Sequence, residues 1–127
     1  MNVNNVVSGT KNYINQLIDT TAESDFAISV IRPIVKMGIN NNFYKIEKLL
    51  KLVADKDGNI DVDKLVDDTI GSVLNGRKGV LPVGDIATIN IGDNCLTFII
   101  PSLNKYFKFD SSDFIKFKNY LVETYGN

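Results

Sequence analysis

The hydrophobic and polar positions of the chain follow two different periods, and the change falls near Gly76. Before that residue, apolar side chains recur every three or four positions, as they do along one face of a helix. After it, apolar and polar side chains alternate, as they do in a strand with one buried face. The pattern predicts helices in the first part of the chain and a small sheet after them.

The first two predicted helices each carry an apolar stripe that we expect to face the core. One helix spans roughly residues 3–20, and its inward positions are Val3, Val6, Val7, Thr10, Ile14, Leu17 and Ile18. A second helix follows Ser24 and stops at Gly38, and its inward positions are Phe26, Val30, Ile31, Ile34 and Met37. Because proline removes a backbone donor and its ring obstructs the preceding turn, we expect Pro33 to kink or break this helix.

Two further helices are predicted before the period changes. The third follows three asparagines at 40–42, whose side chains we expect to cap it, and its inward positions are Phe43, Ile46, Leu49, Leu50 and Val53. The fourth runs over about 62–75, with Asp61 as its N-cap and with Ile60 and Leu65 in contact across its first turn. Gly76 is expected to end it.

The second half of the chain predicts a sheet closed by a helix. Strands are expected over 86–91, 95–100 and 105–109, with a hairpin turn at 92–94 and a short strand near 80–83 before them. Asp110 then caps a last helix, which we expect to cover the sheet.

The predicted fold class is α+β, with N-terminal amphipathic helices followed by a small antiparallel β-meander and a C-terminal helix. We expect residues 1–127 to form a single domain, with a helical part over about 1–76 and the meander and closing helix over about 77–127.

Charges are balanced over the whole chain but segregated along it. The 127 residues carry 14 basic and 15 acidic side chains, a net charge of -1, which disfavours a dedicated nucleic-acid binder. Residues 32–51, however, hold five basic side chains and one acidic, a net +4, while residues 55–68 hold six acidic and two basic, a net -4. Opposed blocks of this kind are suited to pairing between protein surfaces.

The chain has few side chains of the kinds that catalyse reactions. It has no histidine, and its single cysteine, Cys95, falls in a predicted strand, where a small buried side chain is expected. Nucleophile pairs and metal sites that depend on histidine are therefore excluded. Most aspartates fall at predicted helix starts and turns, where capping explains them. We expect a protein that is not an enzyme and that uses no cofactor.

The segment from Asp55 to Asp61 resembles the calcium loop of EF-hand proteins and lies between two predicted helices. With Gly58 at the sixth loop position, the first and twelfth positions are Val53 and Lys64, where calcium requires oxygen ligands. We therefore expect no regulatory calcium site and no dedicated metal site. A weak, nonstandard cation site is an alternative, and its candidate ligands are Asp55, Asp57, Asn59 and Asp61.

These patterns favour a noncatalytic structural or assembly protein that binds a protein partner or associates with itself. The residues expected to make the contact are Lys45, Lys48, Lys51, Asp63 and Asp67. Apolar surface is also expected to be left over on the helix across 3–20 for another subunit, the alternative being that its stripe is covered within a helical bundle of the same chain. One alternative is a module that binds nucleic acid or another acidic ligand through lysine-rich helix faces. A second alternative is a weakly cation-binding helix pair around the degenerate EF-hand-like loop.

Composition also bears on source and location. Asparagine, lysine and isoleucine supply 42 of the 127 residues, a bias typical of bacterial genomes rich in A and T and of their phages and mobile elements. We therefore expect a bacteriophage or mobile-element protein. The first residues lack the pattern of a secretory signal, and no run of about 18 apolar residues occurs, so a cytoplasmic or virion location without membrane contact is expected.

Overall fold

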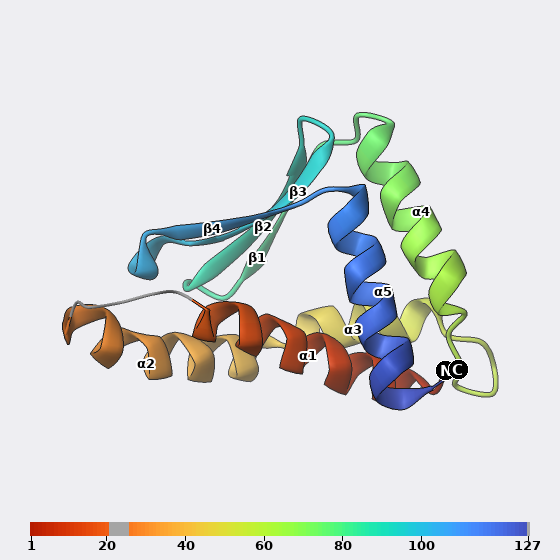
Figure 1. Cartoon of the computed structure of the whole chain (residues 1–127), viewed down its shortest axis with the longest axis horizontal. Helices are drawn as coiled ribbons and strands as arrows, with labels where there is room; N and C mark the ends of the chain where they lie inside the picture. Colours follow the sequence, from red (N-terminus) through yellow and green to blue (C-terminus); the bar gives the residue numbers. More distant parts are fainter. Residues whose placement is uncertain (21–25, 127) are drawn as a thin grey trace.

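The structure is a computed structural model that describes residues 1–20 and 26–126, without the side-chain surroundings of residues 26–28 and 73–74. Within these residues the chain begins with α1 (Val3–Asp19), α2 (Phe26–Asn42), α3 (Tyr44–Val53) and α4 (Val62–Leu74). The strands follow as β1 (Gly79–Val83), β2 (Ala87–Gly92), β3 (Cys95–Ile100) and β4 (Lys105–Phe109), with a short 3-10 helix, η1 (Pro101–Leu103), before β4. Helix α5 (Ser111–Tyr125) comes last (Figure 1), and the predicted α+β class is confirmed.

The four strands form one antiparallel meander in the order β1-β2-β3-β4. Its register places Phe98 between Ile89 and Phe107, so that large apolar side chains line one face of the sheet. Asp93 and Asn94 connect β2 to β3, and both have positive φ angles, 53° and 60°, as a type I′ hairpin turn requires. The meander and this turn agree with the sequence prediction.

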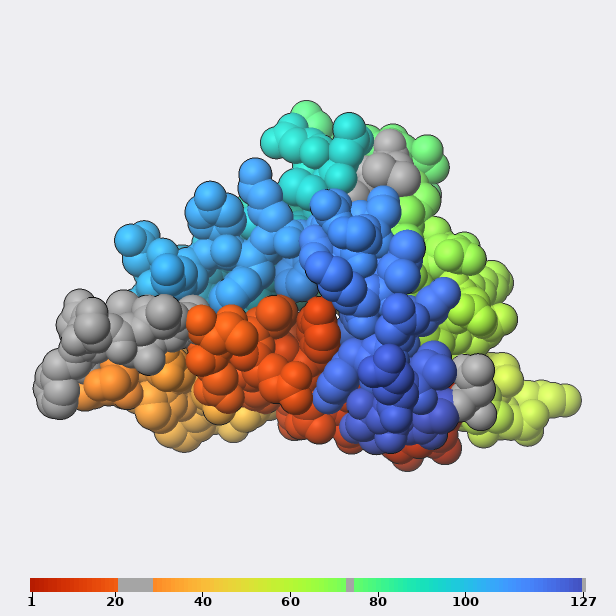
Figure 2. Space-filling model, viewed as in Figure 1, coloured from red at the N-terminus to blue at the C-terminus, as the bar shows by residue number. Residues whose placement is uncertain are grey.

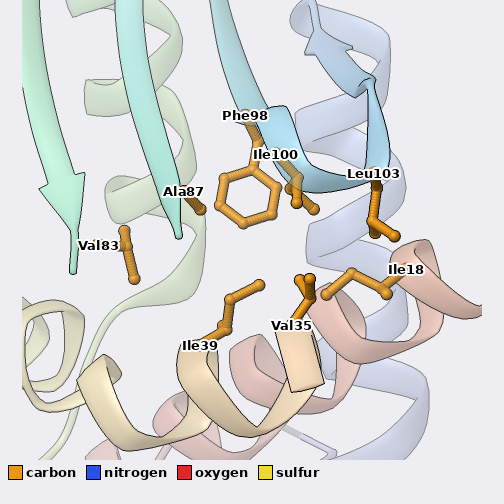
Figure 3. Packing of buried hydrophobic residues seen from close by; sticks show 8 residues of the cluster. All are labelled: Ile18, Val35, Ile39, Val83, Ala87, Phe98, Ile100 and Leu103. Atoms are coloured by element: carbon orange, nitrogen blue, oxygen red, sulfur yellow. The ribbon is translucent and has the colours of Figure 1, made fainter. Parts of the chain in front are cut away.

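The apolar face of the sheet packs mainly on α1 and α2. Figure 3 shows Ile18 of α1 and Val35 and Ile39 of α2 on one side, with Phe98 and Ile100 of β3 opposite them. The same cluster is completed from the strand ends and η1 by Val83, Ala87 and Leu103. The first half of the chain therefore supplies the layer beneath the sheet.

Helix α5 was expected to cover the sheet, and this prediction is wrong for most of the face. Phe114 of α5 meets the sheet at its margin, where its ring lies 6.3 Å from that of Phe109 in β4. Further along α5, Leu121 is fully buried in a second cluster formed with α1, α4 and the loop before α4. The other buried members of that cluster are Val3, Val6, Ile60, Val62 and Val66. Because α1 and α2 already occupy the sheet, α5 closes this second core instead.

Helix α2 runs without a break to Asn42, so the predicted stop at Gly38 is wrong and Pro33 does not end the helix. Pro33 is exposed, so water can solvate the carbonyl group that its ring leaves unpaired in the preceding turn. Gly38 does not adopt the left-handed conformation that ends helices. The start predicted after Ser24 and the side chain of Phe26 fall outside the described residues.

The asparagines at 40–42 lie in the last turn of α2, so their predicted role as caps of α3 is wrong. The Asn42 side-chain amide donates to the Gly38 carbonyl at 2.8 Å, and the Asn40 side-chain oxygen accepts from Asn15 of α1 at 3.0 Å. Only Phe43 separates α2 from α3, and its backbone is itself helical, with φ -66° and ψ -19°. The chain therefore passes from one helix into the next through a helical residue, and no extended residue is present to act as a side-chain cap.

The other predicted helix ends are confirmed. At the start of α4, the Asp61 carboxylate accepts the backbone N–H of Lys64 at 3.1 Å. At the start of α5, Asp110 and Asp113 form a reciprocal capping box. Gly76 follows α4 with a φ of 74°. Capping side chains and glycines thus mark these ends locally, in agreement with the sequence.

Candidate protein-interaction surface

Helix α2 has two apolar faces, and most of the face predicted to point inward points outward. Of the predicted inward residues whose surroundings are described, Ile31 alone packs against the core, where it is half-buried. Val35 and Ile39 are almost completely buried, at 2% and 1% exposure. Val30, Ile34 and Met37, which were expected in the core, are instead about half exposed. The stripe was correctly identified as apolar, but a second stripe on the same helix competes with it and occupies the core.

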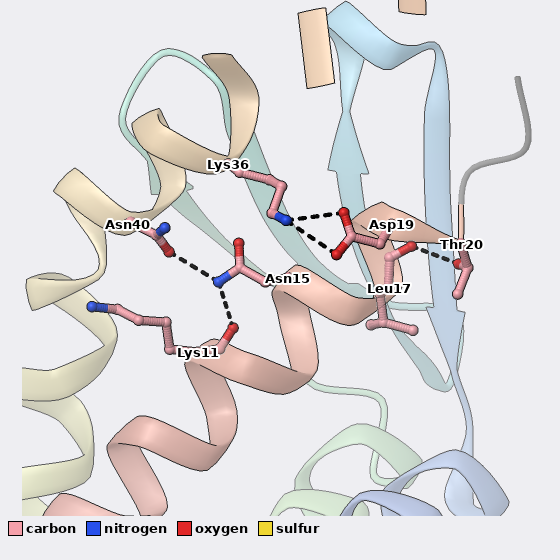
Figure 4. Close-up of polar contacts among 7 residues, drawn as sticks. All are labelled: Lys11, Asn15, Leu17, Asp19, Thr20, Lys36 and Asn40. Carbon is pink, nitrogen blue, oxygen red and sulfur yellow. Dashed lines mark hydrogen bonds and ion pairs between the residues drawn. The ribbon is translucent and has the colours of Figure 1, made fainter. Parts of the chain in front are cut away.

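The orientation of α2 follows from its contacts on two sides. On the sheet side, Gly38 lies against Ile86 of the β1–β2 connection, and a β-carbon at position 38 would collide with the Ile86 side chain. On the α1 side, the Lys36 ammonium pairs with Asp19 at 2.9 Å (Figure 4). The remaining side of α2, with Ile34, therefore faces away from the rest of the protein.

Helix α3 carries further exposed apolar side chains. Leu49 and Val53 were predicted to be buried but are 50% and 57% exposed, and Leu52 is 80% exposed. Together with the exposed side of α2 these residues form what we call the α2–α3 apolar surface. Its members are Val30, Ile34, Met37, Tyr44, Leu49, Leu52 and Val53.

The surplus apolar surface was expected on α1, and this expectation is wrong. Val6 and Ile18 of α1 are fully buried, one in each core cluster, and none of the large apolar side chains of α1 is exposed. Large apolar side chains that gather on the outside of a soluble protein commonly mark a binding surface. The candidate site is therefore on α2 and α3.

Lysines border the α3 part of this surface. The Lys48 ammonium lies 5.6 Å from the centre of the Tyr44 ring, and the Lys51 ammonium pairs with Glu47 at 2.9 Å. Lys45 is half-buried. Among the residues that the structure describes, no carboxylate lies within ion-pair distance of Lys45 or Lys48. The three lysines proposed from the sequence thus lie next to exposed apolar side chains.

The acidic residues that the sequence proposed together with these lysines, Asp63 and Asp67, lie on α4. The Asp63 carboxylate pairs with Lys118 of α5 at 3.0 Å, and Asp67 is exposed. Over the described parts of the chain, no ion pair joins the basic block at 32–51 to the acidic block at 55–68. The structure therefore does not bring the two halves of the predicted charged site together within one molecule.

The loop that resembles an EF-hand is a hydrogen-bonded turn, and it projects at the edge of the molecule (yellow-green in Figure 2). The Asp55 carboxylate accepts the N–H groups of Asp57 and Asn59, both at 2.9 Å, while Asp61 caps α4. Within the described residues, no three acidic or sulfur-bearing side chains converge where they could hold a metal ion. Of the four candidate cation ligands, Asp55 and Asp61 thus bind backbone N–H groups of the turn and the helix start through their carboxylates, while Asp57 and Asn59 contribute backbone N–H groups to Asp55.

Two open hollows border the α2–α3 apolar surface. One, of about 550 Å³, lies beside Met37 and is lined by Pro33, Lys36 and Asn40 among others. The other, of about 570 Å³, lies beside Val53 and runs along α4. Hollows beside an exposed apolar surface are places where side chains of a partner can insert.

The groups with perturbed ionisation belong to helix packing and capping. Burial, together with the negative charge of Asp113, raises the pKa of Tyr13. Hydrogen bonds from Ser112 and Asp113 lower the pKa of Asp110 at the start of α5. The half-buried thiol of Cys95 donates to a backbone carbonyl at 3.4 Å. The two pKa shifts thus follow from the packing of Tyr13 against α5 and from the cap that Asp110 forms at the start of α5.

The apolar part of this surface was not predicted from the sequence. A signal was present, because Val35 and Ile39 continue a second stripe that begins at Ile31, and the two stripes cannot both face the core.

Across the described ranges, no helix has both the length and the apolar character to cross a bilayer. The chain matches no family model, and no curated protein or solved structure shows significant similarity to it.

Proposed function

We propose that this chain is a noncatalytic interaction protein that binds another protein through the α2–α3 apolar surface. The observation that carries the proposal is the concentration of exposed apolar side chains on these two helices. Of the ten large apolar side chains exposed among the described residues, seven belong to this surface, with exposures from 48% to 80%. Removing such area from water stabilises a complex by about 25 cal/mol per Å² before the costs of association.

Other features support the same proposal less directly. A sequence without histidine supports a noncatalytic role. The richness in asparagine, lysine and isoleucine supports a phage or mobile-element origin, and with it a cytoplasmic or virion location. Binding of nucleic acid through the lysines is less favoured, because Lys51 and Lys118 already pair with Glu47 and Asp63.

In-cell photocrosslinking tests the proposal. A photoreactive benzoyl-phenylalanine replaces Met37 or Leu52, and a matched control carries it at Asp67, an exposed polar position on α4. Because Asp67 is itself one of the contact residues proposed from the sequence, a second control carries the photoreactive residue at Glu123, an exposed polar position on α5. We expect a discrete protein adduct from positions 37 and 52 and none from position 123. The proposal is wrong if positions 37 and 52 give no adduct, or if position 123 gives the same one.

The identity of the adduct decides between a foreign protein and a second copy of the chain. Mass spectrometry of the crosslinked peptides identifies both partners directly. Self-association, the alternative within the same function, predicts peptides of this chain on both sides of the crosslink.

A further inference from the structure

We propose that the occupant of the α2–α3 apolar surface is an acidic amphipathic helix of another protein, an inference that rests on the proposed function. The exposed residues Val30, Ile34, Met37, Asn41, Tyr44, Lys48 and Leu52 follow one another at intervals of three or four. A second helix with an apolar stripe has the same spacing, so its side chains fit between these. At about 1.5 Å per residue, the span from 30 to 52 measures about 33 Å, the length of a helix of about 22 residues.

The charges on α2 and α3 indicate which side chains should flank the apolar stripe of the partner helix. Residues 32–51 carry a net charge of +4, and Lys45 and Lys48 have no ion pair among the described residues. Lys45 lies beside the row, and Lys48 belongs to the row itself, where its ammonium group lies against the Tyr44 ring. Carboxylates beside the apolar stripe of the partner helix would meet both ammonium groups. Such charges chiefly speed association and exclude partners of the wrong sign.

A second copy of this chain fits the surface poorly. Two α2–α3 surfaces in contact would bring two blocks of +4 together. The acidic block of another copy has the right charge, but the apolar side chains Val62 and Val66 of α4 are buried in its own core. Among the side chains of α4 that the structure describes, residues 62–72, the exposed ones are polar, namely Asp63, Lys64, Asp67 and Asp68, and they would cover Leu52 without apolar contact.

A lipid surface also fits poorly, although basic amphipathic helices often bind membranes. Asn41 lies in the middle of the row, between Met37 and Tyr44, and is exposed. Its amide would lose hydrogen bonds in acyl chains without replacement. In a helix pair, a single such amide is tolerated and sets the register, since a polar group of the partner can face it.

Two designed peptides of about 22 residues test this inference against the full chain. Both carry the same leucine stripe, flanked in one by glutamates and in the other by lysines. We expect the glutamate peptide to bind about tenfold more tightly in fluorescence anisotropy, with the difference shrinking at high salt. The double variant Lys45→Glu/Lys48→Glu should reverse the order of the two peptides.

A second test shortens one exposed apolar side chain of the surface and compares it with a control position elsewhere. Leu52→Ser should weaken binding of the glutamate peptide by about tenfold, whereas Val80→Ser, at an equally exposed apolar position on β1, should leave it unchanged. Equal binding of both peptides, or of neither, overturns the inference. So does sedimentation of the chain as a dimer that Leu52→Ser dissociates, or binding to vesicles of phosphatidylserine and phosphatidylcholine that Leu52→Ser abolishes.

The two proposals fail in different experiments. If the crosslinks at positions 37 and 52 persist but neither peptide binds, the surface is an interaction site and the acidic helix is the wrong partner. If the crosslinks are absent, the proposed function itself is wrong.

Discussion

Gly38 of α2 lies against Ile86 of the β1–β2 connection with no room for a methyl group between them. Overpacking there costs about 1–3 kcal/mol and helix propensity offsets about 0.5–1 kcal/mol of it, so Gly38→Ala is expected to lower the free energy of unfolding by up to about 2 kcal/mol. Gly71 of α4 is the matched control, because a β-carbon there meets no atom within 4 Å. Gly71→Ala should raise stability by about 0.5–1 kcal/mol through helix propensity. Urea denaturation measures both, and equal effects would contradict the packing of α2 on the sheet.

The two faces of α2 give a second matched pair. Ile39 is buried and Ile34 is exposed, so the same replacement by alanine has different consequences. Ile39→Ala should cost about 2–5 kcal/mol, since it leaves a cavity beneath the sheet. Ile34→Ala should stay within about 0.5 kcal/mol of the wild type. Chemical denaturation that gave the reverse order would show that α2 is rotated relative to this description.

Two substitutions of Asn94, in the turn between β2 and β3, are expected to affect stability differently. Its φ of 60° suits asparagine and glycine but costs other residues about 1–2 kcal/mol. Asn94→Ala should therefore lower the melting temperature, while Asn94→Gly should preserve or raise it. If both variants melt alike, the type I′ geometry is not maintained in solution.

Acid should weaken the start of α5 through Asp110. The pKa of Asp110 is lower in the folded than in the unfolded chain, so its charge stabilises the fold above the unfolded value of about 4. That contribution is lost as the pH falls through the folded pKa. Asp110→Asn keeps an oxygen acceptor without the charge and is the control. The wild type should melt at a higher temperature than Asp110→Asn near pH 7, and the gap should close as the medium becomes acidic.

Calcium should not stabilise the protein, because Asp55 and Asp61 already accept backbone N–H groups. We expect an unchanged melting temperature and no heat in calorimetric titration at millimolar calcium. An upward shift in melting temperature that Asp57→Asn abolishes would restore the weak cation site as an explanation of this loop.

The order and type of the elements were predictable because their signals are local. Asp61 and Asp110 mark helix starts, and the Asp93–Asn94 pair marks a hairpin, within a few residues of where the structure places each. The end of α2 was not predictable in this way, because Gly38 accommodates the close approach of Ile86, far along the chain, and does not end the helix.

The candidate site was only half predictable for the same reason. Charge segregation is written in the sequence, and it identified Lys45 and Lys48. The exposure of Ile34 could not be predicted from the sequence, because α2 has two apolar stripes. Which stripe is buried depends on which one packs against the sheet and α1. A helix whose hydrophobic residues exceed one stripe should therefore be considered for a second contact.

Helix α1 contributes to both cores of this protein. Val6 near its start packs with α4 and α5, whereas Ile18 at its end packs beneath the sheet. If the part of α1 in one core unfolds, the other core is disturbed as well, since both parts belong to one continuous helix. We therefore expect the two cores to melt in a single cooperative transition, and the central amides of α1 to exchange with solvent only when the whole chain unfolds.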